Sequence, residues 1–434
     1  MFSYFTRDVL QCVAAFDSRC PDIGFSPLLE QEETDLTRVD EKNGTSDSRL
    51  PPLTVLVPIC GNRDAYASGQ NYVHTLLDEI QKDDRGLQWL IGIEAERITE
   101  LQARGSQANV RWIPFPKWSS SSVGRLLFEQ LRLPSIIRSV RPDVVYFSAN
   151  FLTLWSSVPS VLSIRSLLYY YYPEAVSRLR LISRRFMTRI AVRKATHIVC
   201  PSRKLSEQVR EVLAVPEERV TAVLHGTNPI YLDEPDDDSV LDRLGLRDRR
   251  YFIYPSSLWE YKNQSTLIRA VKHLSSMGED VTLVLAGWGK TARASYVESL
   301  RSEADQIALP SEVILAGEVS SVDLSALYTH AIALLFPSTC ESFGNPIVEA
   351  MARGCPVVAS NCHALPEIVA GGGTVLDPYD VEAWAGEMSQ LSRPGEYRRR
   401  QVEQAVGRRP LYRAERAVDE LVRVLREAAE SEVD

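Results

Sequence analysis

Two glutamates, Glu341 and Glu349, lie on either side of a predicted strand–loop–helix turn. Residues 331–337 (AIALLFP) predict a strand, and a helix follows from Pro346, because the missing proline N–H costs nothing in a first helical turn. Gly354 is a typical residue for the end of that helix. Carboxylates accept hydrogen bonds from pairs of hydroxyl groups, so both glutamates suit a polyol such as a ribose or a hexose.

The predicted helix start has a second chemical property. Backbone N–H groups around Phe343, Gly344 and Asn345 have no partner within the helix, and together with the helix dipole they attract anions. The spacing alone also fits an ordinary helix start, in which Glu349 complements the dipole and Glu341 is solvated. Spacing therefore leaves a binding role and a structural role open.

The elements that position this turn form repeated strand–helix units. Apolar strands, each followed by helical spacing such as that of residues 71–80, indicate parallel sheets covered on both faces by helices. The predicted fold class is α/β, with two Rossmann-like, doubly wound parallel-sheet domains that face a central cleft. Ligands of such sheets bind at the carboxyl ends of the strands. The predicted strands are 53–59, 89–93, 143–149, 160–164 and 196–202, then 251–257, 281–287, 313–319, 331–338 and 356–360.

An acidic, turn-rich stretch at residues 231–250 separates the two series of strands. We therefore predict an N-terminal Rossmann-like domain at 53–235 and a C-terminal Rossmann-like domain at 236–412. Residues 413–434 are expected to form a C-terminal helix that packs back on the N-terminal domain. Residues 1–52 are predicted to be an N-terminal extension and acidic linker. Residues 26–52 are too polar to bury much apolar surface, whereas residues 1–25 could form an amphipathic helix.

Composition excludes several classes of protein. The net charge of -8 argues against a general nucleic-acid binder. The 7 cysteines include no Cys-x-x-Cys pair and the 6 histidines form no ligand cluster, so we expect neither disulfides nor a bound metal. No apolar run is long enough to cross a bilayer, and charges interrupt the start where a signal peptide needs an apolar core. A cytoplasmic protein is expected.

The segment ESFGNPIVEAMARGCPVVAS (341–360), with Leu365-Pro366-Glu367 after it, resembles the signature of glycosyltransferase family 4. The resemblance covers roughly residues 53–430 and implies the GT-B fold, with 53–235 as the acceptor domain and 236–412 as the nucleotide-sugar-binding domain. It also implies retaining, metal-independent transfer of a hexose from a nucleoside diphosphate sugar to an acceptor hydroxyl. The donor is then a co-substrate, and no other cofactor is expected. By this resemblance Glu341 contacts the donor hexose and Glu349 holds the ribose.

Further segments resemble the donor site of the same family. Lys262, in the segment 252–270, matches a lysine that grips the donor diphosphate, where a fixed cation stabilises the leaving group. Residues 67–71 resemble the glycine loop beneath the diphosphate. The resemblance thus implies donor contacts from Gly69, Ser257, Lys262, Gly287, Val319, Glu341, Phe343, Gly344, Asn345 and Glu349.

The sequence departs from the family pattern at two positions. Ser256 stands where the family usually has an arginine that binds phosphate, and Arg165 stands where it often has a histidine beside the reacting sugar. An arginine cannot act as a base at neutral pH, but it can hold phosphate bidentately. We therefore hypothesise that Arg165 supplies part of the positive charge missing at Ser256; contact with acceptor or solvent is the alternative. The expected catalytic residues are Glu341, Lys262 and Arg165. His225 is expected to be a structural turn residue, with a catalytic role as the alternative.

The stretch 176–194 carries six arginines and one lysine among apolar residues and contains no acid. A basic amphipathic helix of this kind can lie on anionic lipid, which would place the protein at the inner face of a membrane. An ordinary helix with one solvated face and a core stripe has the same spacing. The sequence leaves both interpretations open.

The reaction also has open alternatives. The acceptor of the predicted hexosyltransferase is a glycan, a lipid-linked molecule or a small molecule. Because a family arginine and histidine are absent, the chain could instead be a non-catalytic nucleotide-sugar-binding partner subunit. Another GT-B enzyme, such as a nucleotide-sugar epimerase, is a further alternative. The donor base and sugar, the linkage, the oligomeric state and the role of residues 1–52 are open.

Overall fold

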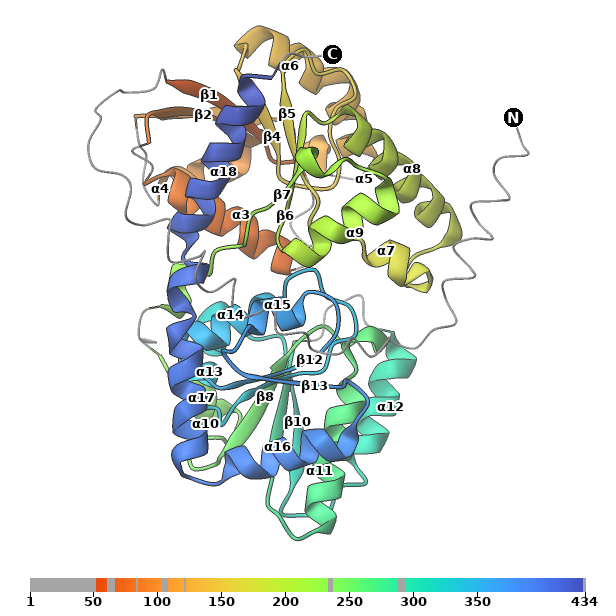
Figure 1. Cartoon of the computed structure of the whole chain (residues 1–434), viewed down its shortest axis with the longest axis vertical. Coiled ribbons are helices and arrows are strands. Elements are labelled where there is room, and N and C mark those ends of the chain that lie inside the picture. Colours follow the sequence, from red (N-terminus) through yellow and green to blue (C-terminus); the bar gives the residue numbers. More distant parts are fainter. Residues whose placement is uncertain are drawn as a thin grey trace. The chain divides into compact units, whose positions relative to one another are not determined.

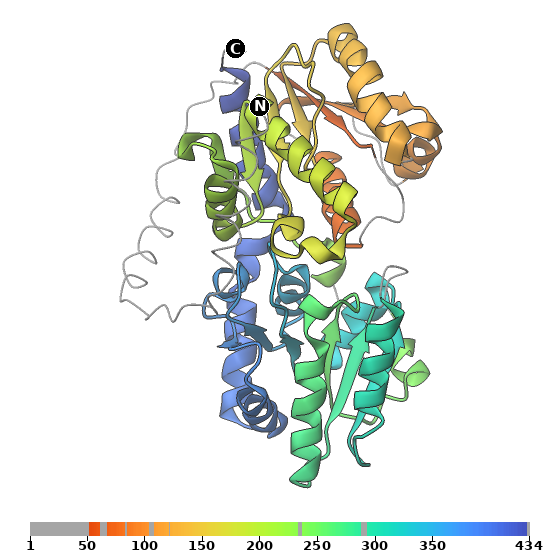
Figure 2. The same cartoon turned by 90° about the vertical axis from the view of Figure 1, so that its right-hand side faces the viewer.

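The computed structural model contains two parallel β-sheets, each packed against helices (Figures 1 and 2). The N-terminal extension and linker predicted for residues 1–52 lie outside the described residues, apart from Pro52. The predicted boundary between residues 235 and 236 also lies outside them and stays a prediction. The structure describes residues 52–60, 67–82, 85–103, 108–120, 122–232, 237–287 and 293–431.

The first sheet has seven strands in the order β3-β2-β1-β4-β5-β6-β7, and every neighbouring pair is parallel. The five predicted strands of this half are present, whereas β3 and β7 were not predicted. Both missed strands lie at the edges of the sheet, where less apolar surface is buried and the sequence is less apolar. The strands are β1 Leu53–Pro58, β2 Leu87–Glu94, β3 Val110–Phe115, β4 Val144–Phe147, β5 Ser160–Ser163, β6 His197–Cys200 and β7 Val220–Ala222.

The second sheet has six parallel strands in the order β10-β9-β8-β11-β12-β13. Counted from its own first strand, it repeats the order 3-2-1-4-5-6 of a doubly wound sheet, whose ligands bind where the order reverses. That reversal lies between β8 and β11. Again only an edge strand, β13, was not predicted. The strands are β8 Tyr251–Pro255, β9 Thr282–Ala286, β10 Glu312–Gly317, β11 Leu334–Phe336, β12 Val357–Ser360 and β13 Thr374–Leu376.

Helices connect successive strands. We call residues 52–232 the first sheet domain and residues 237–413 the second sheet domain. The helices of the first are α3 Ala67–Ile80, α4 Ala95–Ala103, α5 Ser122–Leu127, α6 Leu133–Val140, α7 Leu168–Tyr171, α8 Arg178–Lys194 and α9 Arg203–Leu213. Those that follow are α10 Ser239–Arg243, α11 Gln264–Ser276, α12 Ala294–Ala304, α13 Ser321–His330, α14 Asn345–Ala352, α15 Leu365–Val369, α16 Val381–Ser392, α17 Glu396–Gly407 and α18 Ala414–Ala429. Among the described residues, no helix is both long and apolar enough to span a membrane.

The last helix, α18, returns to the first sheet domain (Figure 1). Val418, Leu421 and Leu425 of α18 are buried in one core with Leu76 and Leu77 of α3 and with residues of the first sheet. Each such side chain contributes about 1.5–3 kcal/mol by leaving water. The chain end therefore stabilises a domain whose other elements come from residues more than 180 positions earlier in the sequence.

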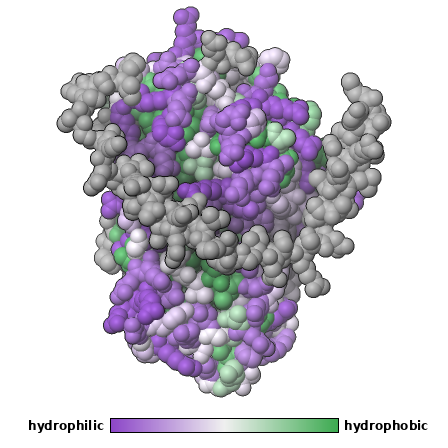
Figure 3. Space-filling model, in the orientation of Figure 1, coloured by the Kyte–Doolittle hydropathy of each residue, from purple (hydrophilic) through white to green (hydrophobic). Residues whose placement is uncertain are grey.

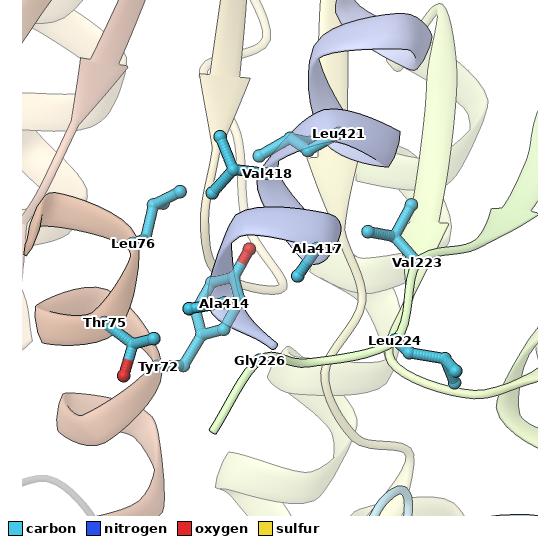
Figure 4. A pocket seen from close by; sticks show the side chains of 10 residues that line it. All are labelled: Tyr72, Thr75, Leu76, Val223, Leu224, Gly226, Ala414, Ala417, Val418 and Leu421. Atoms are coloured by element: carbon cyan, nitrogen blue, oxygen red, sulfur yellow. The ribbon is translucent and has the colours of Figure 1, made fainter. Parts of the chain in front are cut away.

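Gly226 lies where this returning chain crosses the first sheet domain (Figure 4). Thr227 N donates a hydrogen bond of 2.7 Å to Tyr412 O, and Thr227 pairs with Arg413 in an isolated parallel bridge. A Cβ at Gly226 would lie 2.2 Å from the Ala414 Cα. This close approach of two backbones explains the glycine at this position.

We predict that Gly226→Ala lowers the free energy of unfolding by about 1–3 kcal/mol, because the added methyl group overlaps the backbone of α18. Thermal denaturation measures the change. Gly386→Ala is the matched control, since nothing lies within 4 Å of a Cβ at Gly386 in α16, and it should leave stability equal or slightly higher. Equal melting temperatures for Gly226→Ala and the wild type would contradict the prediction.

Candidate functional site

The predicted turn joins β11 to α14. It lies at the carboxyl ends of the strands of the second sheet, next to the point between β8 and β11 where the strand order reverses. Helix α14 begins at Asn345, one residue before the predicted Pro346. Gly344 precedes it with φ 95°, a left-handed conformation that favours glycine. A Cβ there would also lie 3.0 Å from Leu365 Cδ2. The glycine thus lets the loop turn sharply, with the N–H groups at the helix start free of helical partners.

Lys262 and Glu341 form an ion pair across the ends of β8 and β11, between Lys262 Nζ and Glu341 Oε1. Each side chain is 14% exposed. Burial lowers the pKa of Lys262, but the Glu341 carboxylate together with the Tyr261 and Tyr254 hydroxyl groups raises the lysine pKa above its usual value. Because β8 and β11 are neighbouring parallel strands, their carboxyl ends meet. Two of the three residues predicted to be catalytic are therefore brought together.

Glu349 has a different environment. Its side chain is buried in α14, and Tyr328 Oη donates a hydrogen bond of 3.2 Å to Glu349 Oε2. Burial raises the pKa of Glu349 to about 7, against the smaller opposite effect of this hydrogen bond. No cation pairs with the carboxyl among the described residues. The two glutamates of the motif thus differ: Glu341 is held as a paired anion, whereas Glu349 sits close to its titration point at neutral pH.

Arg165 lies close to the start of α14, on the side of the first sheet domain. Its guanidinium carbon is 5.7 Å from the centre of the Tyr72 ring, and that ring stacks on His225 at 4.3 Å. His225 in turn hydrogen-bonds with the Asn345 side chain and lies 5.1 Å from the Phe343 ring. The chain of contacts connects the third predicted catalytic residue to the helix start.

His225 is held neutral by this arrangement. Burial, with a smaller contribution from the nearby charge of Arg165, lowers the pKa of His225 to about 3. The imidazole packs between Tyr72 and Phe343. This environment agrees with the structural role expected for a turn residue, and the imidazole links Tyr72 to the α14 loop.

Three of the remaining predicted donor residues, Ser257, Gly287 and Val319, lie at the carboxyl ends of β8, β9 and β10. Gln264 Nε2 donates to Ser256 Oγ at 2.9 Å and to Ser257 O at 3.0 Å. Gly287 has φ 89°, and a Cβ there would lie 3.3 Å from Ser256 O. Val319 follows β10 and is partly buried against the core. Gly69 falls in the first turn of α3, where the side chains before Tyr72 lie outside the described residues.

Sequence reasoning missed a run of four tyrosines that joins the two sheet domains. Tyr169 and Tyr170 contact α8, through a hydrogen bond between Tyr169 Oη and Thr188 Oγ1 and through Arg185. The next two tyrosines contact the second sheet domain. Tyr172 Oη lies 2.7 Å from Thr339 Oγ1, and the Tyr171 ring lies 5.0 Å from that of His363. The four consecutive tyrosines can be recognised in the sequence, but the residues that they contact cannot be predicted from it.

A second missed contact involves Glu367, which was noted only as part of the resemblance. Its two carboxylate oxygens accept hydrogen bonds of 2.8 and 2.9 Å from the backbone N–H groups of Arg203 and Lys204. These are the first residues of α9, so Glu367 of the second sheet domain caps a helix of the first. Ser202 Oγ adds a bond of 2.7 Å to Ser342 O, next to Glu341.

Metal ligands do not cluster in the part of the chain that the structure describes. No group of three histidine, cysteine, aspartate or glutamate side chains there has the geometry of a metal site. Cys200, Cys340, Cys355 and Cys362 are buried, Cys60 is partly buried, and none of these five described cysteines forms a disulfide.

Two family models match this chain in succession. The model described as Glycosyltransferase Family 4 matches residues 70–230, and the model described as Glycosyl transferases group 1 matches residues 240–408. The matches cover the first and the second sheet domain respectively. They confirm the resemblance inferred from the sequence.

Curated relatives match parts of this chain. An O-antigen chain mannosyltransferase of Salmonella typhimurium is 25% identical over 51% of this chain and 58% of the relative. A GDP-mannose-dependent alpha-(1-6)-phosphatidylinositol monomannoside mannosyltransferase of Mycolicibacterium smegmatis is 33% identical over 34% of this chain and 41% of the relative. The matched segments span less than two thirds of either relative.

Solved structures match nearly the whole described chain. Anabaena HepE in complex with UDP-glucose aligns with a TM-score of 0.64 and 19% identity over 86% of this chain and 100% of its own. A glycosyltransferase of Rickettsia africae aligns with a TM-score of 0.64 and 16% identity over 88% of this chain and 100% of its own. At these identities the likeness concerns the fold, and it confirms the predicted GT-B class.

The pKa of Glu349 predicts a pH-dependent stability. Between pH 4.5, the ordinary value, and about 7, the folded state keeps a proton that the unfolded chain loses, so stability falls as the pH rises. Glu349→Gln cannot ionise and should therefore be more stable than the wild type at about pH 8, by up to about 3 kcal/mol, with little difference at about pH 4. Urea denaturation at both pH values measures the difference.

Glu403→Gln is the control for this experiment, because Glu403 is 69% exposed at its side chain. It should change stability little at either pH. A Glu349→Gln effect of the same size at both pH values would contradict the assignment.

Proposed function

Because the chain belongs to glycosyltransferase family 4, we propose that it transfers a hexose from a nucleoside diphosphate sugar to an acceptor hydroxyl, with retention of anomeric configuration. The observation that carries the proposal is the buried Lys262–Glu341 pair beside the start of α14. The pair combines a fixed cation for a diphosphate with a carboxylate for sugar hydroxyls. The helix start supplies further N–H donors for an anion.

The proposed mechanism assigns the positive groups to the leaving diphosphate. As the bond from the sugar C1 to the phosphate oxygen breaks, Lys262 and the N–H groups from Phe343 to Asn345 stabilise the negative charge that develops. When donor binds, its phosphate oxygens compete with Glu341 for Lys262. Glu341 is then free to accept hydrogen bonds from the hexose. These protein cations replace a metal ion in the proposal.

The acceptor proton needs a destination. In the proposed reaction the acceptor oxygen bonds to C1 on the face that the diphosphate leaves. The acceptor proton passes to the oxygen of the departing phosphate, so no enzyme base is required. His225 is not assigned this role, because the contacts that hold it neutral also enclose it between Tyr72 and Phe343. Closure of the two sheet domains around the donor would exclude water that would otherwise hydrolyse the donor.

Arg165 is proposed to share the charge stabilisation. Ser256 cannot do so, because its hydroxyl is uncharged and accepts a hydrogen bond from Gln264. Arg165 reaches the α14 loop through Tyr72 and His225. A bidentate guanidinium on this side would complement Lys262 on the other.

Mannose from GDP-mannose is the first donor to test, because the Mycolicibacterium relative is named as GDP-mannose-dependent. UDP-glucose is the second, because Anabaena HepE was crystallised with it. The named relatives act on an O-antigen chain and on a phosphatidylinositol mannoside, so a glycan or a lipid-linked acceptor is proposed ahead of a small molecule. We place the reaction in the cytoplasm, at the inner face of a membrane.

A thermal-shift screen of GDP, UDP, ADP and dTDP tests the donor site. A nucleotide present at about 100 times its dissociation constant should stabilise the protein by about 2.7 kcal/mol. Acceptor-dependent release of the same nucleoside diphosphate from its sugar conjugate then tests transfer. Release without acceptor dependence would favour a different GT-B enzyme such as an epimerase. Nucleotide binding with neither transfer nor slow hydrolysis would favour the non-catalytic partner subunit. That alternative rests on the serine at position 256 and the arginine at position 165, where the family usually has an arginine and often a histidine.

Substitution of the two cations tests the mechanism. We predict that Lys262→Met and Arg165→Ala each lower kcat/KM by about 100-fold or more, because each removes charge stabilisation from the leaving group. Arg165→Lys should recover only part of the activity, since an ammonium lacks the planar fork. Steady-state kinetics with the donor identified by the screen provides the measurement. Arg138→Ala, at an exposed arginine of the first sheet domain, is the control; unchanged kinetics for Arg165→Ala would remove Arg165 from the mechanism.

A further inference from the structure

Helix α8 turns apolar side chains toward solvent. Leu179 is 79% exposed, and Ile182 and Phe186 are each 62% exposed. Spacings of three and four residues place all three on one face of the helix. The residues that α8 buries are smaller or more polar: Thr188, Ala191 and Val192. The interpretation of α8 as an ordinary surface helix with a core stripe is therefore wrong for these three side chains.

Basic side chains surround this apolar face. Arg189 and Arg193 continue the same face by further steps of three and four residues, and both are exposed. Arg178 flanks it at the first turn and is exposed as well. No aspartate or glutamate occurs between residues 175 and 206. The face thus combines large apolar groups with uncompensated positive charge.

Other charged helices of this protein neutralise their own arginines. In α18, Arg416 pairs with Glu420 and Arg423 with Glu427. Within the part of the chain that the structure describes, no ion pair involves a basic residue of α8. Its Arg185 points inward and donates hydrogen bonds to the carbonyls of Tyr169 and Tyr170. The surface in Figure 3 is otherwise mostly hydrophilic, with separate hydrophobic residues.

We propose that α8 docks this protein on a bilayer that carries anionic lipids. Leu179, Ile182 and Phe186 would insert at the boundary between headgroups and acyl chains, while the flanking arginines contact lipid phosphates. The net charge of -8 would repel the rest of the chain from such a surface, so a local basic face is required. The helix lies in the interface and does not span the bilayer.

The docking face is connected to the candidate site. Tyr169 and Tyr170 bind α8, and the same run ends on Thr339 and Tyr261 of the second sheet domain. Arg165 lies four residues before Tyr169. A membrane at α8 is thus adjacent in structure to the side from which the acceptor must come. Within the proposed function, this favours a lipid-linked acceptor. Docking itself does not depend on that function, because it needs neither donor nor acceptor.

Vesicle co-sedimentation of the full chain tests the proposal. Vesicles of phosphatidylcholine with about one third phosphatidylglycerol should bind the wild type at least about tenfold more strongly than phosphatidylcholine alone, and added salt should weaken the binding. Leu179→Ser/Ile182→Ser/Phe186→Ser and Arg189→Glu/Arg193→Glu should each reduce binding to anionic vesicles by about tenfold or more.

Met277→Ser/Leu309→Ser is the matched control, because these side chains are 65% and 85% exposed on the second sheet domain. It should bind vesicles as the wild type does. An unchanged nucleotide thermal shift in the α8 variants shows that they are folded with an intact donor site. If no nucleotide shifts any variant or the wild type, the donor proposal fails while the vesicle result still decides docking.

Three results would overturn the proposal. The first is wild-type protein that does not sediment with anionic vesicles, and the second is α8 variants that bind them as the wild type does. The third is a concentration-dependent dimer in light scattering that the triple serine variant abolishes, without vesicle binding. That outcome would identify the face as a contact between two copies of the chain.

Discussion

The candidate site depends on one buried ion pair, between Lys262 and Glu341. Two opposite charges with little exposure stabilise one another only while both are present, because an unpaired buried charge is strongly unfavourable. The pair therefore holds the loop before α14 against the end of β8 in the absence of donor. It also offers the two kinds of group that a sugar diphosphate needs, a cation for phosphate and a carboxylate for hydroxyls. Binding of donor would replace the contact between Lys262 and Glu341 by contacts of Lys262 with phosphate oxygens and of Glu341 with sugar hydroxyls.

The second sheet domain supplies most of this site, but the first domain completes it. Arg165 approaches the start of α14 through Tyr72 and His225. Glu367 caps α9, and the tyrosine run ends on Thr339, two residues before Glu341. The domains are also joined by α18, which begins beside Gly226 and packs into the first core. Polar groups that can separate and re-form thus make the contacts between the two sheet domains around the site. Helix α18, in contrast, connects the two domains through apolar packing.

The two departures from the family pattern have a common physical effect. A serine at position 256 removes a cation from the end of β8, and an arginine at position 165 adds one on the opposite domain. The total positive charge available to a diphosphate is then similar, but part of it moves with the first domain. In that arrangement, stabilisation of the diphosphate charge would depend on closure of the first sheet domain onto the second. Closure would couple the reaction to elements of the first sheet domain such as α8.

The sequence by itself determined the interior strands, the start of α14 to within one residue and the family, because these depend on local periodicity and on a contiguous motif. It did not determine the edge strands β3, β7 and β13, which bury too little surface to be strongly apolar. Only the tertiary structure brought Lys262 to Glu341, 79 positions apart. It also buried Glu349 and turned Phe186 outward. Periodicity tells which residues share a face of a helix, but the neighbours that cover that face come from distant parts of the chain.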